Sequence, residues 1–441
     1  MKTKHFLQCL LIVAALFTYS CSSDSEDDPG TGSGGGGQSG LTSITVTASL
    51  QSFEIGNTVT FTVTGNDGSD VSSLATILVN NSSIQGNDYT PTATGNFQIK
   101  ATYDGLTSST ISIEVTPPVI VSLRVESSAS NLKVGDTADF TVFGKNALDV
   151  EYNITDSAVL TVNGSEIPGS KFLAITNNDL MVSAALDGAT SEVINVSVTD
   201  EVAPGVFQKT VCIIDATGTW CQFCPRVSYG IELVEAATDK AFIIAAHSGG
   251  GDVMENPASI ALVNQINPAG TFPTAVLNGN IDWSFPEPDN VAQVTNLATG
   301  TTSRGLSVNS IVAGDNLQVY VSAAFAQSMP NAKLAVYVLE SGIDADQVNG
   351  TSYYGGVNPL NAASGFTHNH TLRSSLTAVL GDAIPAGNSA AGQKYTQVFD
   401  VPIPSSINDR DEISVVAMII GDNFEIVASN GGHTGVDKDF N

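Results

Sequence analysis

The sequence predicts a multidomain protein: two all-β sandwiches in tandem, one α/β domain and a C-terminal β-sandwich. Three observations carry this prediction. A segment in the first half of the chain occurs twice. Near the middle, an apolar strand pattern, a CxxC motif and a helical pattern follow one another. Alternating apolar and polar residues return after them, and a chain of 441 residues has room for several cores.

The charge of the chain excludes one class of function. It has 16 basic and 44 acidic residues, a formal net charge of −28. Such a surface offers nothing to neutralise a phosphate backbone, so we expect no nucleic-acid partner. We interpret the acidity as a property that keeps the protein soluble.

Residues 1–20 are predicted to be a lipoprotein signal peptide. Lys2 and Lys4 precede an apolar run that is too short to span a membrane. The run ends in TYSC, residues 18–21, which resembles a bacterial lipobox with an uncommon Tyr. This resemblance implies cleavage before Cys21 and lipidation of its thiol. The alternative is a plainly secreted protein with a coincidental cysteine.

Residues 21–40 are predicted to be a tether. An acidic cluster, SSDSEDD, follows the cysteine, and a flexible Gly-rich stretch completes the segment. The cluster resembles the export signal of Bacteroidetes lipoproteins that reach the outer face of the outer membrane, although a solvated spacer explains it equally well. We therefore expect a lipid-anchored outer-membrane protein exposed at the cell surface, with a periplasm-facing orientation as the alternative.

Residues 41–117 and 118–201 are predicted to form the two sandwiches. IGNTVTFTVTG at 55–65 aligns with VGDTADFTVFG at 134–144, an offset of 135 − 56 = 79 residues, and a Pro-Pro pair lies between the copies. Their alternation is typical of half-buried antiparallel strands. The copies resemble bacterial Ig-like modules of surface proteins. We expect spacers rather than glycan- or protein-binding modules, because aromatic residues are sparse.

The α/β domain, residues 202–302, is predicted around VCIIDATGTWCQFCPR, residues 211–226. The apolar start indicates a buried strand, a glycine breaks it, and a helical pattern begins at the CxxC motif. Backbone N–H groups and the positive dipole end of a helix favour a thiolate there. On this interpretation Cys221 exchanges with a substrate, and Cys224, one turn further on, resolves the mixed disulfide.

Other residues strengthen the interpretation of this motif. Asp215, at the end of the strand, could take up the proton of the inner thiol. Trp220 would shield one side of the sulfur pair, and TFPT at 271–274 precedes another apolar strand. His247 ends the apolar strand pattern 241–247, where catalytic groups of open sheets collect. It could raise the thiolate fraction or relay a proton, or it merely caps the strand.

The pattern DxxxxxWCxxC followed by x-P-T resembles the thioredoxin fold. The resemblance implies a thioredoxin-like domain for residues 202–302 and a cis peptide bond before Pro273, facing the disulfide. The predicted site residues are Cys221, Cys224, Asp215, Pro273, Trp220 and His247.

From residue 303 to residue 441 the pattern returns to strands and predicts the third β-sandwich. Its FTHNHTLR stretch would project His368 and His370 from one strand face, where they could bind zinc or copper. No third ligand is evident nearby in the sequence. We therefore expect no metal site there and no cofactor in the chain.

The lipobox, TGTWCQFCPR, TFPT and HNHTLR together resemble the outer-membrane protein twenty-eight family of Bacteroidetes lipoproteins. The resemblance covers roughly residues 202–441. It implies an outer-membrane lipoprotein with a thioredoxin-like domain, and it implies no defined substrate.

Three cysteines remain after Cys21, namely Cys212, Cys221 and Cys224. An odd number in an oxidising compartment favours one disulfide and one buried thiol, and Cys212, in the apolar strand, is the natural free one. We favour a redox-active CxxC pair over an inert disulfide or a metal site. The predicted function is thiol–disulfide exchange on extracytoplasmic proteins. The alternative is a surface-binding or scaffold lipoprotein whose disulfide is inert.

Overall fold

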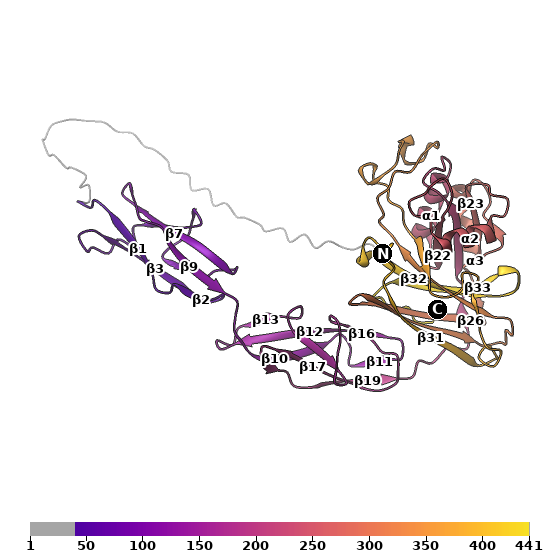
Figure 1. The fold of residues 1–441 in the computed structure, drawn as a ribbon, viewed down its shortest axis with the longest axis horizontal. Coiled ribbons are helices and arrows are strands. Elements are labelled where there is room, and N and C mark those ends of the chain that lie inside the picture. Colours follow the sequence, from indigo (N-terminus) through magenta and orange to yellow (C-terminus); the bar gives the residue numbers. More distant parts are fainter. Residues whose placement is uncertain (1–39, 441) are drawn as a thin grey trace, which may run out of the picture. The chain divides into compact units, whose positions relative to one another are not determined.

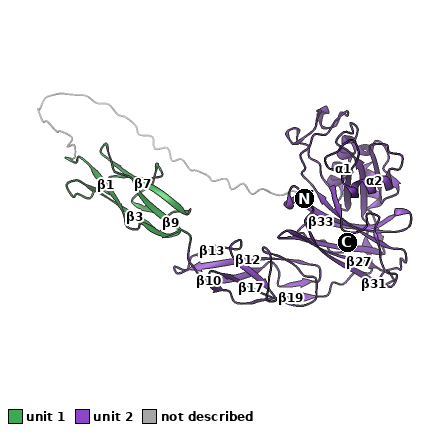
Figure 2. Ribbon diagram, viewed as in Figure 1, with its two compact units in different colours: residues 1–117 green, residues 118–441 purple. Residues whose placement is uncertain are grey.

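The fold is that of a computed structural model, which describes residues 40–440 (Figure 1). The predicted signal peptide, the lipidation site Cys21 and nearly all of the tether lie outside the described residues. The chain divides into two compact units, residues 1–117 and residues 118–441 (Figure 2). Within the described part, no helix combines the length and the apolar character that crossing a membrane requires.

The described part of the first unit is a β-sandwich. One sheet has the order β1-β3-β6 and the other β2-β9-β7-β4-β5, with β8 beside β7. In β3 every second residue, beginning with Val59, is buried, because alternate side chains of a strand point to opposite faces. These apolar faces form one core between the sheets. The strands are β1 (Ile44–Ala48), β2 (Ser52–Glu54), β3 (Val59–Gly65), β4 (Thr76–Val79), β5 (Ser82–Ser83), β6 (Asp88–Tyr89), β7 (Gly95–Tyr103), β8 (Leu106–Thr107) and β9 (Ile111–Thr116).

The second unit begins with another β-sandwich. Its sheets have the orders β10-β12-β13, with β16 beside β12, and β11-β19-β17-β14-β15, with β18 beside β17. The second order repeats that of the first unit strand for strand, which fits the sequence repeat. The strands are β10 (Ile120–Ser127), β11 (Asn131–Lys133), β12 (Thr137–Asn146), β13 (Glu151–Asn153), β14 (Val159–Val162), β15 (Ser165–Glu166), β16 (Lys171–Leu173), β17 (Leu180–Leu186), β18 (Ala189–Thr190) and β19 (Ile194–Thr199).

The rest of the second unit is built on a 9-stranded sheet of order β24-β23-β21-β22-β29-β28-β32-β33, with β30 beside β28, and on a 3-stranded sheet of order β26-β27-β31. Figure 1 shows the helices gathered near β22 and β23, apart from β26 and β31. The elements are β20 (Phe207–Gln208), β21 (Val211–Thr217), α1 (Pro225–Ala237), β22 (Ala241–His247), α2 (Pro257–Ile266), β23 (Thr274–Leu277), β24 (Ile281–Asp282), η1 (Glu287–Asn290), α3 (Val291–Leu297), β25 (Thr301–Thr302), β26 (Arg304–Ala313), β27 (Asn316–Phe325), β28 (Lys333–Glu340), η2 (Tyr353–Gly356), η3 (Ala362–Ser364), β29 (Thr371–Ser375), β30 (Asp382–Ala383), β31 (Gln393–Pro402), η4 (Arg410–Glu412), β32 (Ile413–Ile420), η5 (Asp422–Phe424) and β33 (Ile426–His433).

The prediction of a separate thioredoxin-like α/β domain, followed by a separate sandwich, is wrong. Strands make up 45% of the described residues and helices 12%, so this part of the chain is nearly all β. β21 pairs with β22 in parallel and with β23 antiparallel, but the free edge of β22 bonds to β29, where Ala245 faces Thr371. The strands expected for two domains therefore form one continuous sheet. The physical reason is that an apolar strand such as β22 needs hydrogen-bonding partners on both edges.

The two faces of β21 meet different neighbours. Val211 and Ile213 pack with α1 and α3, whereas Cys212 and Ile214 pack with α2 and the C-terminal strands. Alternation along the strand therefore turns Asp215 toward the α1 side of the sheet. The same alternation keeps Cys212 on the opposite side.

Candidate functional site

The CxxC motif forms a disulfide at the start of α1. Cys221 and Cys224 are joined by an S–S bond of 2.10 Å. Cys224 is the N-cap of α1, and no side chain caps the helix there. Both residues are buried, with 4% and 1% of their surface exposed. The positive end of the helix dipole therefore points at the sulfur pair, where it favours a thiolate.

Asp215 is a buried carboxyl on the α1 side of the sheet, with 2% of its surface exposed. Burial raises the pKa of Asp215 to about 8. The nearby charge of Glu287 adds to this rise in pKa, and that of Arg226 opposes it. Arg226 and Glu287 form an ion pair of 2.5 Å between Nε and Oε2. Oδ1 of Asp215 has no hydrogen-bond partner among the described residues. A carboxyl of this kind is neutral at pH 7 and able to donate a proton.

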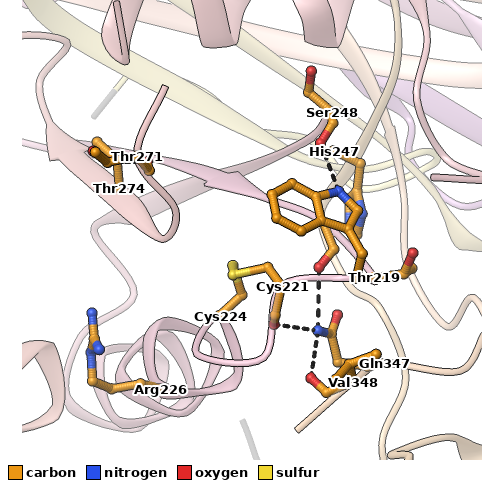
Figure 3. The surroundings of a disulfide bond; sticks show 12 residues. Thr219, Cys221, Cys224, Arg226, His247, Ser248, Thr271, Thr274, Gln347 and Val348 are labelled. Atoms are coloured by element: carbon orange, nitrogen blue, oxygen red, sulfur yellow. Dashed lines mark hydrogen bonds between the residues drawn. A yellow bond between two sulfur atoms is a disulfide. The ribbon is translucent and has the colours of Figure 1, made fainter. Parts of the chain in front are cut away.

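The loop before β23 lies on one side of the disulfide. The Phe272–Pro273 peptide bond is cis, as the resemblance to the x-P-T pattern implied. Trp220 is 40% exposed, its ring meets that of Phe272 edge-on at 5.1 Å, and its Nε1 donates to the carbonyl of Ser248 at 3.1 Å. In Figure 3 the disulfide lies between this loop, marked by Thr271 and Thr274, and Gln347. Trp220 is therefore packed against Phe272 of this loop and remains partly open to solvent.

A segment distant in the sequence covers the other side. Residues 341–370, between β28 and β29, are called the strap here. The backbone N–H of Val348 donates to the carbonyl of Thr219 at 2.8 Å, and that of Gly350 to Gln222 at 2.7 Å. Nε2 of Gln347 donates to the carbonyl of Cys221 at 2.9 Å (Figure 3). The strap thus fixes the backbone of the CxxC turn.

Gln347 was missed at the sequence level. It is 2% exposed, and it also donates to the carbonyls of Gly218 and Val348, at 3.2 and 3.0 Å. A single neutral Gln in a loop has no periodicity and no motif around it. No local signal could have found this residue.

His247 lies at the end of β22 and belongs to a hydrogen-bond network. Its Nδ1 is 2.9 Å from Oδ2 of Asp252, and the same oxygen accepts the N–H of Thr219 at 2.7 Å. Burial would raise the pKa of Asp252, but the hydrogen bond and the charge of His247 lower it to about 2. His247 is therefore connected to the CxxC turn through Asp252. Asp252, in a glycine-rich loop, was also missed.

The two histidines of the HNH stretch precede β29 and have different partners. Nε2 of His368 lies 3.2 Å from the carbonyl of Ala345, and Nε2 of His370 lies 2.9 Å from Oε1 of Glu235. The rings of His368 and His247 meet edge-on at 5.1 Å. Burial lowers the pKa of His368 to about 4. Among residues 40–440, no group of three or more His, Cys, Asp or Glu is placed to hold a metal ion.

Cys212 is the free cysteine of the described chain, as predicted, and it is fully buried. Burial raises the pKa of its thiol. It lies on the α2 side of β21, its Sγ 3.8 Å from the sulfur of Met418. It is therefore separated from the disulfide by the sheet.

The comparison with protein families concerns the C-terminal part of the chain. Residues 260–430 match the family model described as outer membrane protein Omp28. This match supports the family resemblance seen in the sequence and an association with the outer membrane. It begins after the CxxC motif, so it says nothing about the chemistry of the sulfurs.

Solved structures resemble the chain only loosely. HBP35 of Porphyromonas gingivalis is 18% identical, with a TM-score of 0.41, over 52% of this chain and 77% of that one. Domains 5-6 of the S-layer protein SbsC are 16% identical, with a TM-score of 0.16, over 37% and 99%. The Yersinia pseudotuberculosis adhesin InvE is 16% identical, with a TM-score of 0.21, over 38% and 62%. Likeness of this degree carries no conclusion about function. No match was found among curated proteins.

Proposed function

We propose that this protein is an outer-membrane lipoprotein, anchored through Cys21 and exposed at the cell surface, that exchanges thiols and disulfides on extracytoplasmic proteins. One observation carries the exchange chemistry. The Cys221–Cys224 disulfide stands at the N-terminus of α1, and the buried carboxyl of Asp215 lies on the same side of the sheet. The lipobox and the family match support the location.

The chemistry begins at Cys221. A substrate thiolate attacks its Sγ, a substrate–Cys221 disulfide forms, the Cys221–Cys224 bond breaks, and Cys224 leaves as a thiolate. Asp215 donates its proton to that thiolate and later regains one from solvent. A second substrate thiolate attacks the substrate sulfur of the mixed disulfide and releases Cys221, which takes up the second proton.

The products of this sequence balance. Two substrate thiols become one disulfide, and two electrons and two protons arrive at Cys221 and Cys224. The reverse sequence reduces a substrate disulfide. The reduction potential of the CxxC pair, relative to that of the substrate, decides the direction.

One observation favours a second candidate, a surface-binding or scaffold lipoprotein with an inert disulfide. Both cysteines are buried, and the strap is hydrogen-bonded to the backbone of the CxxC turn. With 4% of its surface exposed, Cys221 offers little access to a large substrate.

The equilibrium reduction potential of Cys221–Cys224 separates the two candidates. Thiol alkylation of the mature chain across graded glutathione or dithiothreitol buffers measures this potential, and a Cys221→Ser, Cys224→Ser double variant corrects for Cys212. A potential above about −230 mV supports exchange, and one below about −300 mV indicates a structural disulfide. Insulin reduction no faster than that of a Cys221→Ala variant would reject the proposal.

A further inference from the structure

The outer edge of β31 is a long strand edge that the fold leaves open. β31 has 10 residues, lies at the end of the sheet β26-β27-β31, and pairs with β27 over its whole length. Figure 1 shows it apart from α1. Because an open strand edge is a template for pairing with another chain, folded proteins keep such edges short or covered.

The other edge strands of residues 40–440 are short or covered. Most have five residues or fewer. The longer ones, β10, β26 and β33, bond to segments outside their sheets. Leu123 of β10 forms a bridge with Ser191, and the N–H of Val308 in β26 donates to the C-terminal tail at 2.9 Å. The N–H of Ser429 in β33 donates to Oγ1 of Thr210 at 3.1 Å. The open edge of β31 is therefore an exception in this fold.

The hydrogen-bond pattern of the sheet decides which backbone groups of β31 point outward. The N–H of Ile403 donates to the carbonyl of Asp315 at 2.9 Å, where the ladder between β27 and β31 ends. Antiparallel strands bond at every second residue, so the odd-numbered residues of β31 bond to β27. The outward N–H and C=O groups, which have no hydrogen bond within the described chain, are those of the even-numbered residues Lys394, Thr396, Val398 and Asp400.

The charged side chains of β31 do not block this edge. The carboxylate of Asp400 accepts hydrogen bonds from two amide side chains of β27, at 2.7 and 3.1 Å. The ammonium of Lys394 lies 3.3 Å from Oε2 of Glu201. Both groups are thus directed toward their own chain. Between them, Thr396 and Val398 are exposed, and Val398 keeps 42% of its surface open.

We propose that β31 pairs antiparallel with β31 of a second copy of this chain, across a two-fold axis at Gln397. The pairing joins two three-stranded sheets into one. In this register Lys394 lies opposite the partner's Asp400, and Thr396 lies opposite the partner's Val398. The outward backbone groups of the two copies then meet as hydrogen-bonded pairs, and opposite charges face each other at both ends.

A second copy fits this edge better than an unrelated extended segment does, because the strand is complementary to itself. A two-fold axis brings the same patch of both copies together, which is the commonest symmetry of soluble oligomers. The net charge of −28 on each copy opposes association, so added salt should favour the dimer. The pairing does not depend on the exchange chemistry, since β31 and the strand that leads to the CxxC motif belong to different sheets.

Sedimentation equilibrium of the full mature chain tests the pairing. The Cys21→Ala substitution is included, so that no lipid drives association. We expect a molar mass that rises with protein concentration to twice that of the monomer, and that does so at lower protein concentration when salt is added. Val398→Pro removes an outward N–H and no bond to β27, so it should be a folded monomer by circular dichroism. Val193→Pro, at a 55% exposed valine just before β19, is the matched control and should dimerise like the wild type.

Gln397→Cys tests the register without a proline. At the two-fold axis the Cβ atoms of residue 397 in the two copies would lie about 4.5 Å apart, near the spacing of a disulfide. Under oxidising conditions this variant should form a covalent dimer, whereas Val398→Cys, opposite the partner's Thr396, should not. A wild type that stays monomeric at every concentration would overturn the proposal and leave the edge to a different polypeptide. So would a Val398→Pro variant that dimerises like the wild type, or a Gln397→Cys variant that does not cross-link.

Discussion

The buried carboxyl of Asp215 makes the stability of the second unit depend on pH. Burial raises its pKa from the ordinary value of 3.8 to about 8 in the folded protein. Between these pH values the native state holds a proton that the unfolded chain has released. The free energy of unfolding therefore falls, by at most about 1.4 kcal/mol per pH unit, as the pH rises from 4 to 8.

Asp215→Asn should abolish this dependence, because the amide stays neutral at every pH. At pH 7 the raised pKa of the wild-type carboxyl lowers the free energy of unfolding by at most about 4 kcal/mol. The new amide leaves N–H groups without partners, which costs about 1–3 kcal/mol. The net expectation at pH 7 is a variant more stable than the wild type by roughly 1–3 kcal/mol. The difference should widen toward pH 8 and reverse below about pH 5.

Urea unfolding at pH 5, 6, 7 and 8 tests this expectation. The chain has 2 tryptophans, Trp220 and Trp283, and both flank the site, so their fluorescence reports this part of the molecule. Asp239→Asn, at an exposed position after α1, is the matched control and should follow the wild type at each pH. Parallel pH profiles for the wild type and Asp215→Asn would refute the reasoning.

Three further predictions concern the strap and the other cysteines. Gln347→Ala leaves the carbonyl of Cys221 without its side-chain donor and should destabilise the protein by about 1–3 kcal/mol, seen in the urea midpoint. It should also speed reduction by dithiothreitol, and an unchanged rate would mean that the strap does not restrict the site. Cys212→Ala should leave the reduction potential unchanged and remove one thiol detected after denaturation. Cys21→Ala should abolish labelling by a fatty-acid analogue in cells, and persistent labelling would place the lipid elsewhere.

The sequence was informative where the physical signal is local. The alternation in β3 and β12, the apolar run of β21 and the start of α1 at the CxxC motif all follow from short-range periodicity. The buried free thiol of Cys212 follows from it too, because a cysteine on a buried apolar strand is itself buried. The cis bond at Pro273 came from the resemblance to a known pattern and not from periodicity.

The sequence was uninformative about which strand edges pair. β22 has the same apolar pattern whether its outer edge ends a domain or continues a sheet. The sequence therefore gives no sign of its pairing with β29. The position of the strap beside the CxxC turn could not be predicted for the same reason. Its contact with the CxxC turn joins Gln347 to Cys221 across 126 positions of sequence, through a neutral side chain and a carbonyl.

The pairing of β22 with β29 affects which fragments of the chain can remain monomeric. A fragment that ends at residue 302 would contain the CxxC motif, yet it would lack β29 and so expose to water the edge of β22 at Ala245, which pairs with Thr371. Exposed edges of this kind bind to one another, so such a fragment should self-associate instead of remaining a small monomeric catalyst. The smallest autonomous piece that carries the disulfide must extend at least through β29.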